Sequence, residues 1–157
     1  MDFQTKVDID QAIGVEGGYA AINPVVSHPA GKFAEVELPI GSFCWNGTEP
    51  DQVTNTGTGK PLGFVVREQA YVIADYRAEA QNFVPQGANV SVALKGDFFA
   101  KTATATTIGQ KVFASLTDGS ISTGAAGAAI AGYIETDYTV VTEGDIGDII
   151  MISNWMA

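Results

Sequence analysis

The sequence predicts a mainly β protein, either a compact β-barrel or a β-sandwich, with an extended N-terminal arm. Short apolar runs, several of them alternating with polar residues, recur along the chain as half-buried strands do. Glycine, proline, asparagine and aspartate separate these runs, which is typical of tight turns. The hydrophobic fraction of 46% and the charged fraction of 17% exclude a disordered chain.

The length of 157 residues suits one domain with an arm better than two full domains. We therefore divide the chain into an extended arm, residues 1–31, and a β-rich domain, residues 32–157. Residues 1–31 show little hydrophobic periodicity, because their apolar side chains are spread among acids, glycines and two prolines. Two interpretations stay open: this segment docks on another chain, or it is the first edge strand and a surface loop of the domain.

The first part of the domain contains one clear strand pattern. Residues 32–38 are expected to form a half-buried strand, because every second side chain is apolar while two glutamates share the other face. A short apolar piece follows at residues 42–45, and Asn46-Gly47 is a strong tight-turn dipeptide. Residues 49–60 are rich in threonine, asparagine, glycine and aspartate, so we expect a loop there.

The middle of the chain has the longest apolar run of β-rich composition, residues 64–76, and we predict a strand that continues through residues 77–81. Residues 90–94 again alternate between apolar and other side chains. We expect them to form a hairpin with residues 98–101 through Lys95-Gly96-Asp97.

The last third predicts a second hairpin, in which residues 111–116 pair with residues 120–122 through Asp118-Gly119. Residues 123–129 are glycine- and alanine-rich, so they form either a flexible loop or a close approach of two backbones. The apolar run that ends the chain is expected to be a strand covered on both faces. The remaining strand candidates are residues 133–134, 138–141 and 148–152.

Charge and cysteine content limit the function. Eighteen acidic and eight basic residues give a formal charge of -10, so the surface repels phosphates and we expect no direct binding of nucleic acid. The start lacks a signal peptide pattern and no apolar run approaches about 20 residues, so we expect synthesis in the cytoplasm and no membrane span. Cys44 lies between Phe43 and Trp45 and is predicted to be a buried hydrophobe.

The sequence offers no combination of residues suited to catalysis or metal binding. The single histidine, His28, and the single cysteine, Cys44, are too few for a nucleophile with its base and orienting group, or for a zinc site of four ligands. Paired acids are expected to be solvated turn residues. We therefore expect no enzyme, no metal and no cofactor. A hydrolase that uses only acids stays open as an alternative; its candidates are Glu68, Asp75 and Glu79.

Several segments of this chain resemble the structural cement, or head decoration, proteins of tailed bacteriophages. The resemblance extends over about residues 3–121. Its clearest segments are Val15-Glu16-Gly17 through Asn23-Pro24, Gly63-Phe64-Val65-Val66-Arg67-Glu68-Gln69, Gly96-Asp97-Phe98 and Gly109-Gln110-Lys111-Val112-Phe113-Ala114. Membership would imply a homotrimer on the outer face of the virion head, where it binds the major capsid protein and clamps neighbouring capsomers against DNA pressure.

Under this interpretation, apolar side chains of the arm contact the capsid or a neighbouring subunit. These candidate contact residues are Phe3, Val7, Ile9, Ile13, Tyr19 and Ile22. A second hypothesis is a small β-sandwich module of a virion that binds carbohydrate or a host surface through stacked aromatic rings. The rings available for such stacking are Trp45, Tyr71, Tyr76 and Trp155.

Overall fold

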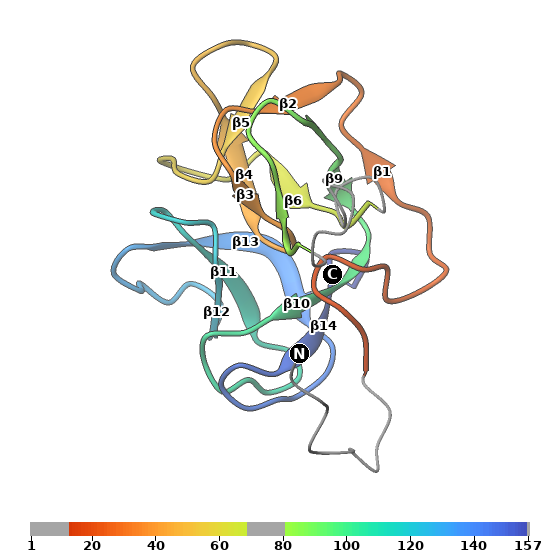
Figure 1. The fold of residues 1–157 in the computed structure, drawn as a ribbon. Coiled ribbons are helices and arrows are strands. Elements are labelled where there is room, and N and C mark those ends of the chain that lie inside the picture. The colour runs from red at the N-terminus through yellow and green to blue at the C-terminus, as the bar shows by residue number, and fades with distance from the viewer. Residues whose placement is uncertain (1–12, 69–80, 157) are drawn as a thin grey trace, which may run out of the picture.

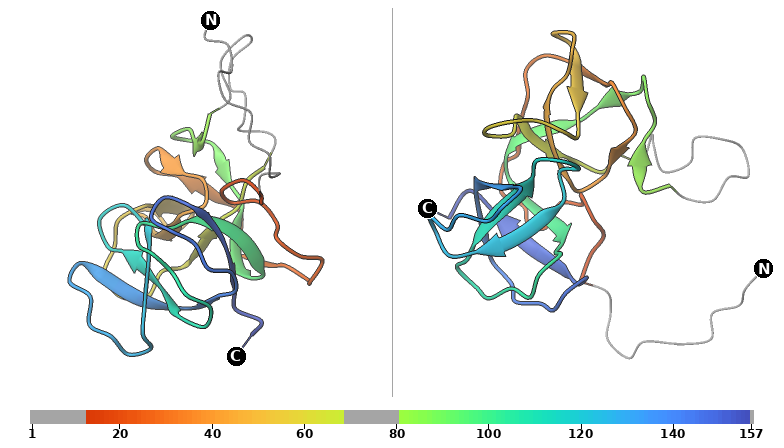
Figure 2. Two further views of the ribbon diagram at one scale, coloured as in Figure 1. Left: turned by 90° about the horizontal axis from the view of Figure 1, so that it is seen from below. Right: turned by 90° about the vertical axis from the view of Figure 1, so that its left-hand side faces the viewer.

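The computed structural model describes residues 13–68 and 81–156. Within these ranges the chain forms 14 strands in three sheets, with no helix and with no sheet closed into a barrel. The prediction of a mainly β fold is therefore confirmed, and of its two alternatives the sandwich-like arrangement is the one that forms. The two larger sheets lie one above the other in Figure 1 and in the right-hand view of Figure 2.

The upper layer is a seven-stranded sheet with the strand order β1-β9-β6-β4-β5-β2-β8. Its neighbours pair antiparallel except β2 and β5, which are parallel. A two-stranded sheet of β3 and β7 accompanies it. The strands are β1 (Val26–Ser27), β2 (Lys32–Ala34), β3 (Leu38–Pro39), β4 (Phe43–Asn46), β5 (Gln52–Thr54), β6 (Gly63–Val65), β7 (Phe83–Val84), β8 (Asn89–Val90) and β9 (Val92–Lys95).

The lower layer is a five-stranded antiparallel sheet with the order β10-β14-β13-β11-β12. The hairpin predicted through Asp118-Gly119 is confirmed, since β11 and β12 pair with Phe113 opposite Ser122. The two strand candidates at 133–134 and 138–141 belong to one strand, β13. The strands are β10 (Asp97–Lys101), β11 (Lys111–Ser115), β12 (Ile121–Gly124), β13 (Tyr133–Val140) and β14 (Ile149–Ser153).

The upper sheet differs from the prediction at two places. The expected strand 32–38 divides into β2 and β3, because the chain bends after Ala34 and Val36 turns outward. The expected loop 49–60 contains β5, which adds a strand between β2 and β4. Only one residue of β5, Val53, is apolar and buried. A single such residue gives no alternating pattern from which a strand could be predicted. The part of the predicted strand 64–81 that covers residues 69–80 lies outside the described residues.

The predicted hairpin of residues 90–94 with residues 98–101 is wrong. β9 pairs with β6 and β1 in the upper sheet, whereas β10 pairs with β14 in the lower one. The chain crosses between the layers from β9 to β10 (Figure 1). Gly96 lies at this crossing, and an added Cβ there would lie 2.7 Å from the ring of Phe98. A turn-like tripeptide therefore marks a change of sheet, because the partners of β10 come from the distant C-terminal end of the chain.

The seven-stranded sheet buries side chains on both faces. In β6, Phe64 belongs to the core between the two layers and Val65 to a second core within the upper layer; in β9, Ala93 and Val92 divide in the same way. This division explains why Phe64-Val65 and Val92-Ala93 are apolar at successive positions, since successive side chains point to opposite faces.

The core between the layers is centred on aromatic rings. Phe64 lies 5.5 Å from Phe43 and 5.0 Å from Phe98, measured between ring centroids, and 6.2 Å from Tyr138. Phe43 and Phe64 come from the upper sheet, whereas Phe98 and Tyr138 come from the lower one. Such pairs stabilise a core beyond their buried area, so this cluster joins the layers.

We expect Phe64→Ala to lower the free energy of unfolding by about 3–5 kcal/mol, because it leaves a cavity among three other rings. The matched control is Phe33→Ala, at a strand position that is 42% exposed, which should cost less than about 1 kcal/mol. Urea unfolding followed by tryptophan fluorescence measures both values. Equal losses would contradict this account of the core.

Two glycines with similar backbone angles separate steric from conformational cost. Gly119 and Gly127 have φ of 71° and 75°, but an added Cβ would lie 2.1 Å from the carbonyl oxygen of Phe43 at Gly119 and would meet nothing within 4 Å at Gly127. Both alanine variants should lose about 1–2 kcal/mol from the left-handed backbone. Gly119→Ala should lower the free energy of unfolding by about 1–3 kcal/mol more than Gly127→Ala, because its side chain overpacks. Urea unfolding of both variants measures this difference.

Candidate functional site

The described part of the N-terminal segment, residues 13–31, lies along the domain and pairs with its strands much as an added strand does. Gly17 N donates to Phe99 O at 2.8 Å, Phe99 N to Gly18 O at 2.9 Å and Ala20 N to Asp97 O at 2.9 Å. Further on, β1 pairs with β9 in the upper sheet. The segment therefore contacts both layers, first β10 of the lower sheet and then β9 of the upper sheet.

Close backbone packing fixes the start of this segment. Gly17 has φ of 74°, and an added Cβ there would lie 2.5 Å from the side chain of Ile40. Gly41 faces it, since its added Cβ would lie 2.8 Å from Gly17 N. Any larger side chain at either position would push the segment off the domain, which is the physical reason for the glycines.

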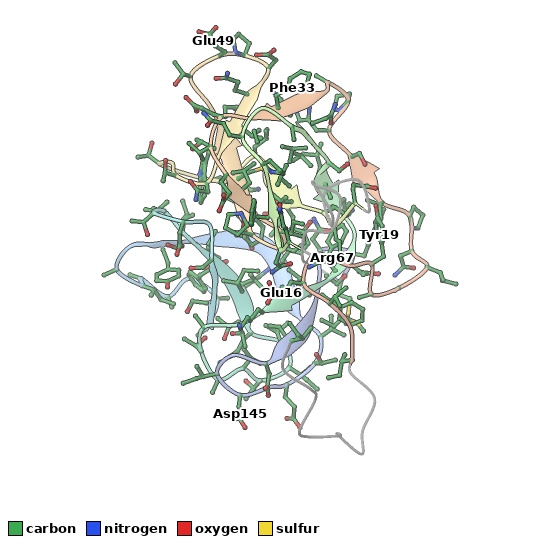
Figure 3. All side chains as sticks on the ribbon, viewed as in Figure 1. Glu16, Tyr19, Phe33, Glu49, Arg67 and Asp145 are labelled. Atoms are coloured by element: carbon green, nitrogen blue, oxygen red, sulfur yellow. The ribbon has the colours of Figure 1, made fainter. Side chains whose placement is uncertain are left out.

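A polar network holds the same point from the side. Arg67 Nε donates to Glu16 O at 2.8 Å, and Arg67 N donates to Gly17 O at 2.8 Å. Asn82 joins the network: its amide oxygen accepts from the guanidinium of Arg67, and its amide nitrogen donates to the carboxylate of Glu16. Figure 3 places Glu16 and Arg67 next to each other. Glu16 is thereby linked to two loops of the upper layer.

Three of the candidate contact residues can be located in the structure. Ile13, Tyr19 and Ile22 are 61%, 53% and 104% exposed. Tyr19 also packs its ring 5.9 Å from that of Phe98, so it is anchored at one side and open at the other. Phe3, Val7 and Ile9 lie outside the described residues. The sequence reasoning missed Val15 and Val26, which are exposed on the same segment.

The C-terminal residues also meet this segment. Trp155 Nε1 donates to Pro24 O at 3.0 Å, and Lys95 Nζ lies 3.9 Å from the centre of the Trp155 ring. Asn154 Nδ2 donates to Leu94 O at 2.9 Å. The exposed apolar surface of the N-terminal segment thus continues onto Trp155. Nothing local in the sequence signals this contact, because it joins residues far apart in the chain.

A buried acid ties the middle of the segment to the domain. Asp97 is buried, and its Oδ2 accepts a hydrogen bond from Asn23 Nδ2 at 2.5 Å. A charge-assisted bond to a buried carboxylate is stronger than a neutral one at the surface. The hydrogen bond between Asn23 and Asp97 therefore holds the loop that carries Ile22 in place.

The described residues form no candidate metal site. They contain no group of three or more histidine, cysteine, aspartate or glutamate side chains that could hold a metal ion. His28 Nδ1 is hydrogen bonded locally, to the backbone of Ala30. Of the acids considered for a hydrolase, Glu68 is half-buried, whereas Asp75 and Glu79 lie outside the described residues. No described helix is long and apolar enough to cross a membrane.

The aromatic residues considered for carbohydrate stacking differ in their exposure to solvent. Trp45 is buried, with Nε1 donating to Gly59 O at 2.9 Å, so it presents no face to a ligand. Trp155 is exposed, with Lys95 over its ring. Tyr71 and Tyr76 lie outside the described residues. The structure therefore brings no two of these rings together in the part that it describes.

Comparisons with known proteins give one family. Residues 3–154 match the family model described as XM1 gp53 minor capsid protein. The fold is similar to a chain of the capsid of Myoviridae phage XM1, with a TM-score of 0.72, 14% sequence identity and 98% of each chain covered. It is also similar to the head fibre gp8.5 N base of bacteriophage phi29, with a TM-score of 0.47, 13% identity, and 83% of this chain and 93% of that one covered. No curated protein sequence matches.

Cys44 should be unreactive in the folded protein. It is fully buried, and burial raises the pKa of its thiol to about 12, although a backbone hydrogen bond at Gly63 partly opposes this shift. Because only the thiolate attacks disulfide reagents, we expect labelling at about pH 8 to be limited by unfolding. A cysteine placed at the exposed position Ile146 should react at once in the same assay. Rapid labelling of Cys44 without denaturant would contradict its burial.

Proposed function

Because this chain belongs to the XM1 gp53 minor capsid protein family, we propose that it is a cement protein that clamps neighbouring capsomers on the outer face of a phage head. Membership of the family makes it a capsid-associated structural protein of a virion, as the resemblance to head decoration proteins predicted. We further propose that the major capsid protein is its partner, that it acts as a homotrimer, and that its role is structural and not enzymatic.

The observation that carries this proposal is the exposed apolar surface of the anchored N-terminal segment. Its backbone is held by both sheets, while Ile13, Tyr19 and Ile22 project into solvent. Fully burying such a side chain contributes about 1.5–3 kcal/mol before the cost of ordering. A rigid segment carries a smaller ordering cost than a free one, so the contact it makes is correspondingly stronger.

Clamping follows if several copies act together. One subunit need bind only weakly when linked subunits engage adjacent capsomer edges, because each further contact forms at a high effective concentration. The charge supports the outer face: a protein with a formal charge of -10 is repelled by packaged nucleic acid.

The test is co-sedimentation of the purified protein with heads that lack it, in immature and in expanded form. Saturable binding that prefers expanded heads, with a greater resistance of those heads to heat, is the expected result. Deleting residues 2–13 should abolish or strongly weaken this binding. Absence of binding to either form of head, or undiminished binding after the deletion, would overturn the proposal as stated.

A matched pair of surface variants tests which face binds. Ile13→Ser with Ile22→Ser should weaken head binding at least about tenfold, because each lost apolar contact is worth more than about 1.4 kcal/mol. Ile108→Ser with Ile146→Ser changes residues that are 67% and 74% exposed on loops of the lower sheet, and should leave binding unchanged. Titration of labelled protein onto heads measures both. The reverse pattern would place the contact on those loops instead.

A further inference from the structure

The lysine and arginine side chains of this acidic protein differ in whether they contact an acceptor or a carboxylate. In the described ranges, the amine of Lys32 donates to Pro50 O at 2.6 Å, Lys60 pairs with Asp137 at 2.5 Å, and Arg67 binds the Glu16 network. The remaining described cations have no described carboxylate within salt-bridge distance. These are Lys95, Lys101 and Lys111.

Two of these lysines line one groove, and the amine of Lys95 also lies 3.9 Å from the centre of the Trp155 ring. Lys95 and Lys111 border a groove of about 420 Å³ together with Leu94, Asp137, Asn154 and Met156. The carboxylate of Asp137 is already paired with Lys60, so it does not neutralise them. Leu94 and Met156 are exposed apolar side chains. The groove therefore combines apolar walls with two positive charges, and its volume is in the range of about 300–1,000 Å³ that ligand sites occupy.

The walls of this groove are held in place. Leu94 and Lys95 end β9 in the upper sheet, whereas Lys111 begins β11 in the lower sheet. Asn154 joins the C-terminal wall to β9, since its Nδ2 donates to Leu94 O and its Oδ1 accepts from Gly96 N, both at 2.9 Å. A site built from both sheets and fixed by these hydrogen bonds is preorganised for a ligand.

The chain itself contains a segment of complementary chemistry. In Val7-Asp8-Ile9-Asp10, apolar and acidic side chains alternate. An extended chain presents such residues on two opposite faces, one apolar and one carrying two negative charges. We propose that residues 7–10 of one copy bind in the Lys95–Lys111 groove of a second copy, so that arm exchange builds the oligomer. This inference rests on the proposed self-association and is independent of head binding.

The course of the N-terminal segment favours a second copy over the same one. From residue 17 to residue 26 the segment runs past Phe99, then Asp97, then Lys95. The described segment starts beside Phe99, since an added Cβ at Gly14 would lie 2.5 Å from the Phe99 ring. Its start is thus the end remote from Lys95, and this favours the groove of a second copy over that of the same copy.

Charge reversal on the two sides tests the pairing. Sedimentation velocity of the full chain, over a range of concentrations, should show self-association that weakens as salt rises, because the pairs lie near the surface. Lys95→Glu with Lys111→Glu, and separately Asp8→Lys with Asp10→Lys, should each weaken it at least about tenfold. Combining all four changes in one chain should restore it. An equal mixture of the two double variants should associate more strongly than either variant alone, since two of the three groove–arm contacts in a mixed trimer then join opposite charges.

The control is Lys101→Glu, which changes the same charge outside the groove and should leave the mass unchanged. Circular dichroism of each variant checks that the fold is retained. A wild-type monomer at all concentrations, or double variants that associate as the wild type does, would overturn the proposal. Head binding is measured separately. A protein that self-associates through the groove but does not bind heads would refute the cement role alone.

Discussion

The seven-stranded upper sheet packs apolar side chains on both faces, and both cores of the protein depend on this packing. On one face Phe43 and Phe64 meet Phe98 and Tyr138 of the lower sheet. On the other face the smaller side chains of the same strands fill a core within the upper layer. Packing on two faces requires a fixed register, because a shift by one residue would exchange the two sets of side chains.

The sequence allowed the elements with strong local signals to be predicted. The β11–β12 hairpin follows from its alternation and from Asp118-Gly119, and β14 from its apolar run. β5 was missed because only Val53 is buried in it. The crossing at Gly96 was missed because Lys95-Gly96-Asp97 has the chemistry of a hairpin turn, while the choice between β9 and β14 as the partner of β10 is decided by packing between distant segments.

The candidate site shows a similar limit. Ile13, Tyr19 and Ile22 could be chosen from their apolar character in a segment without a core pattern, and the structure leaves all three exposed. Trp155 could not be chosen on such grounds, because its place beside Pro24 is set by a hydrogen bond between residues 131 positions apart. The clustering of Lys95 with Lys111 likewise depends on the meeting of two sheets, which no local pattern encodes.

The attachment of residues 17–27 to both layers has a mechanical consequence. Consider a force along the segment, which runs antiparallel to β10 and β9. Its backbone hydrogen bonds are then stretched side by side and share the load, instead of opening one after another like a zipper. Because the segment is hydrogen bonded to strands of both sheets, the load passes to both layers and not to one of them alone.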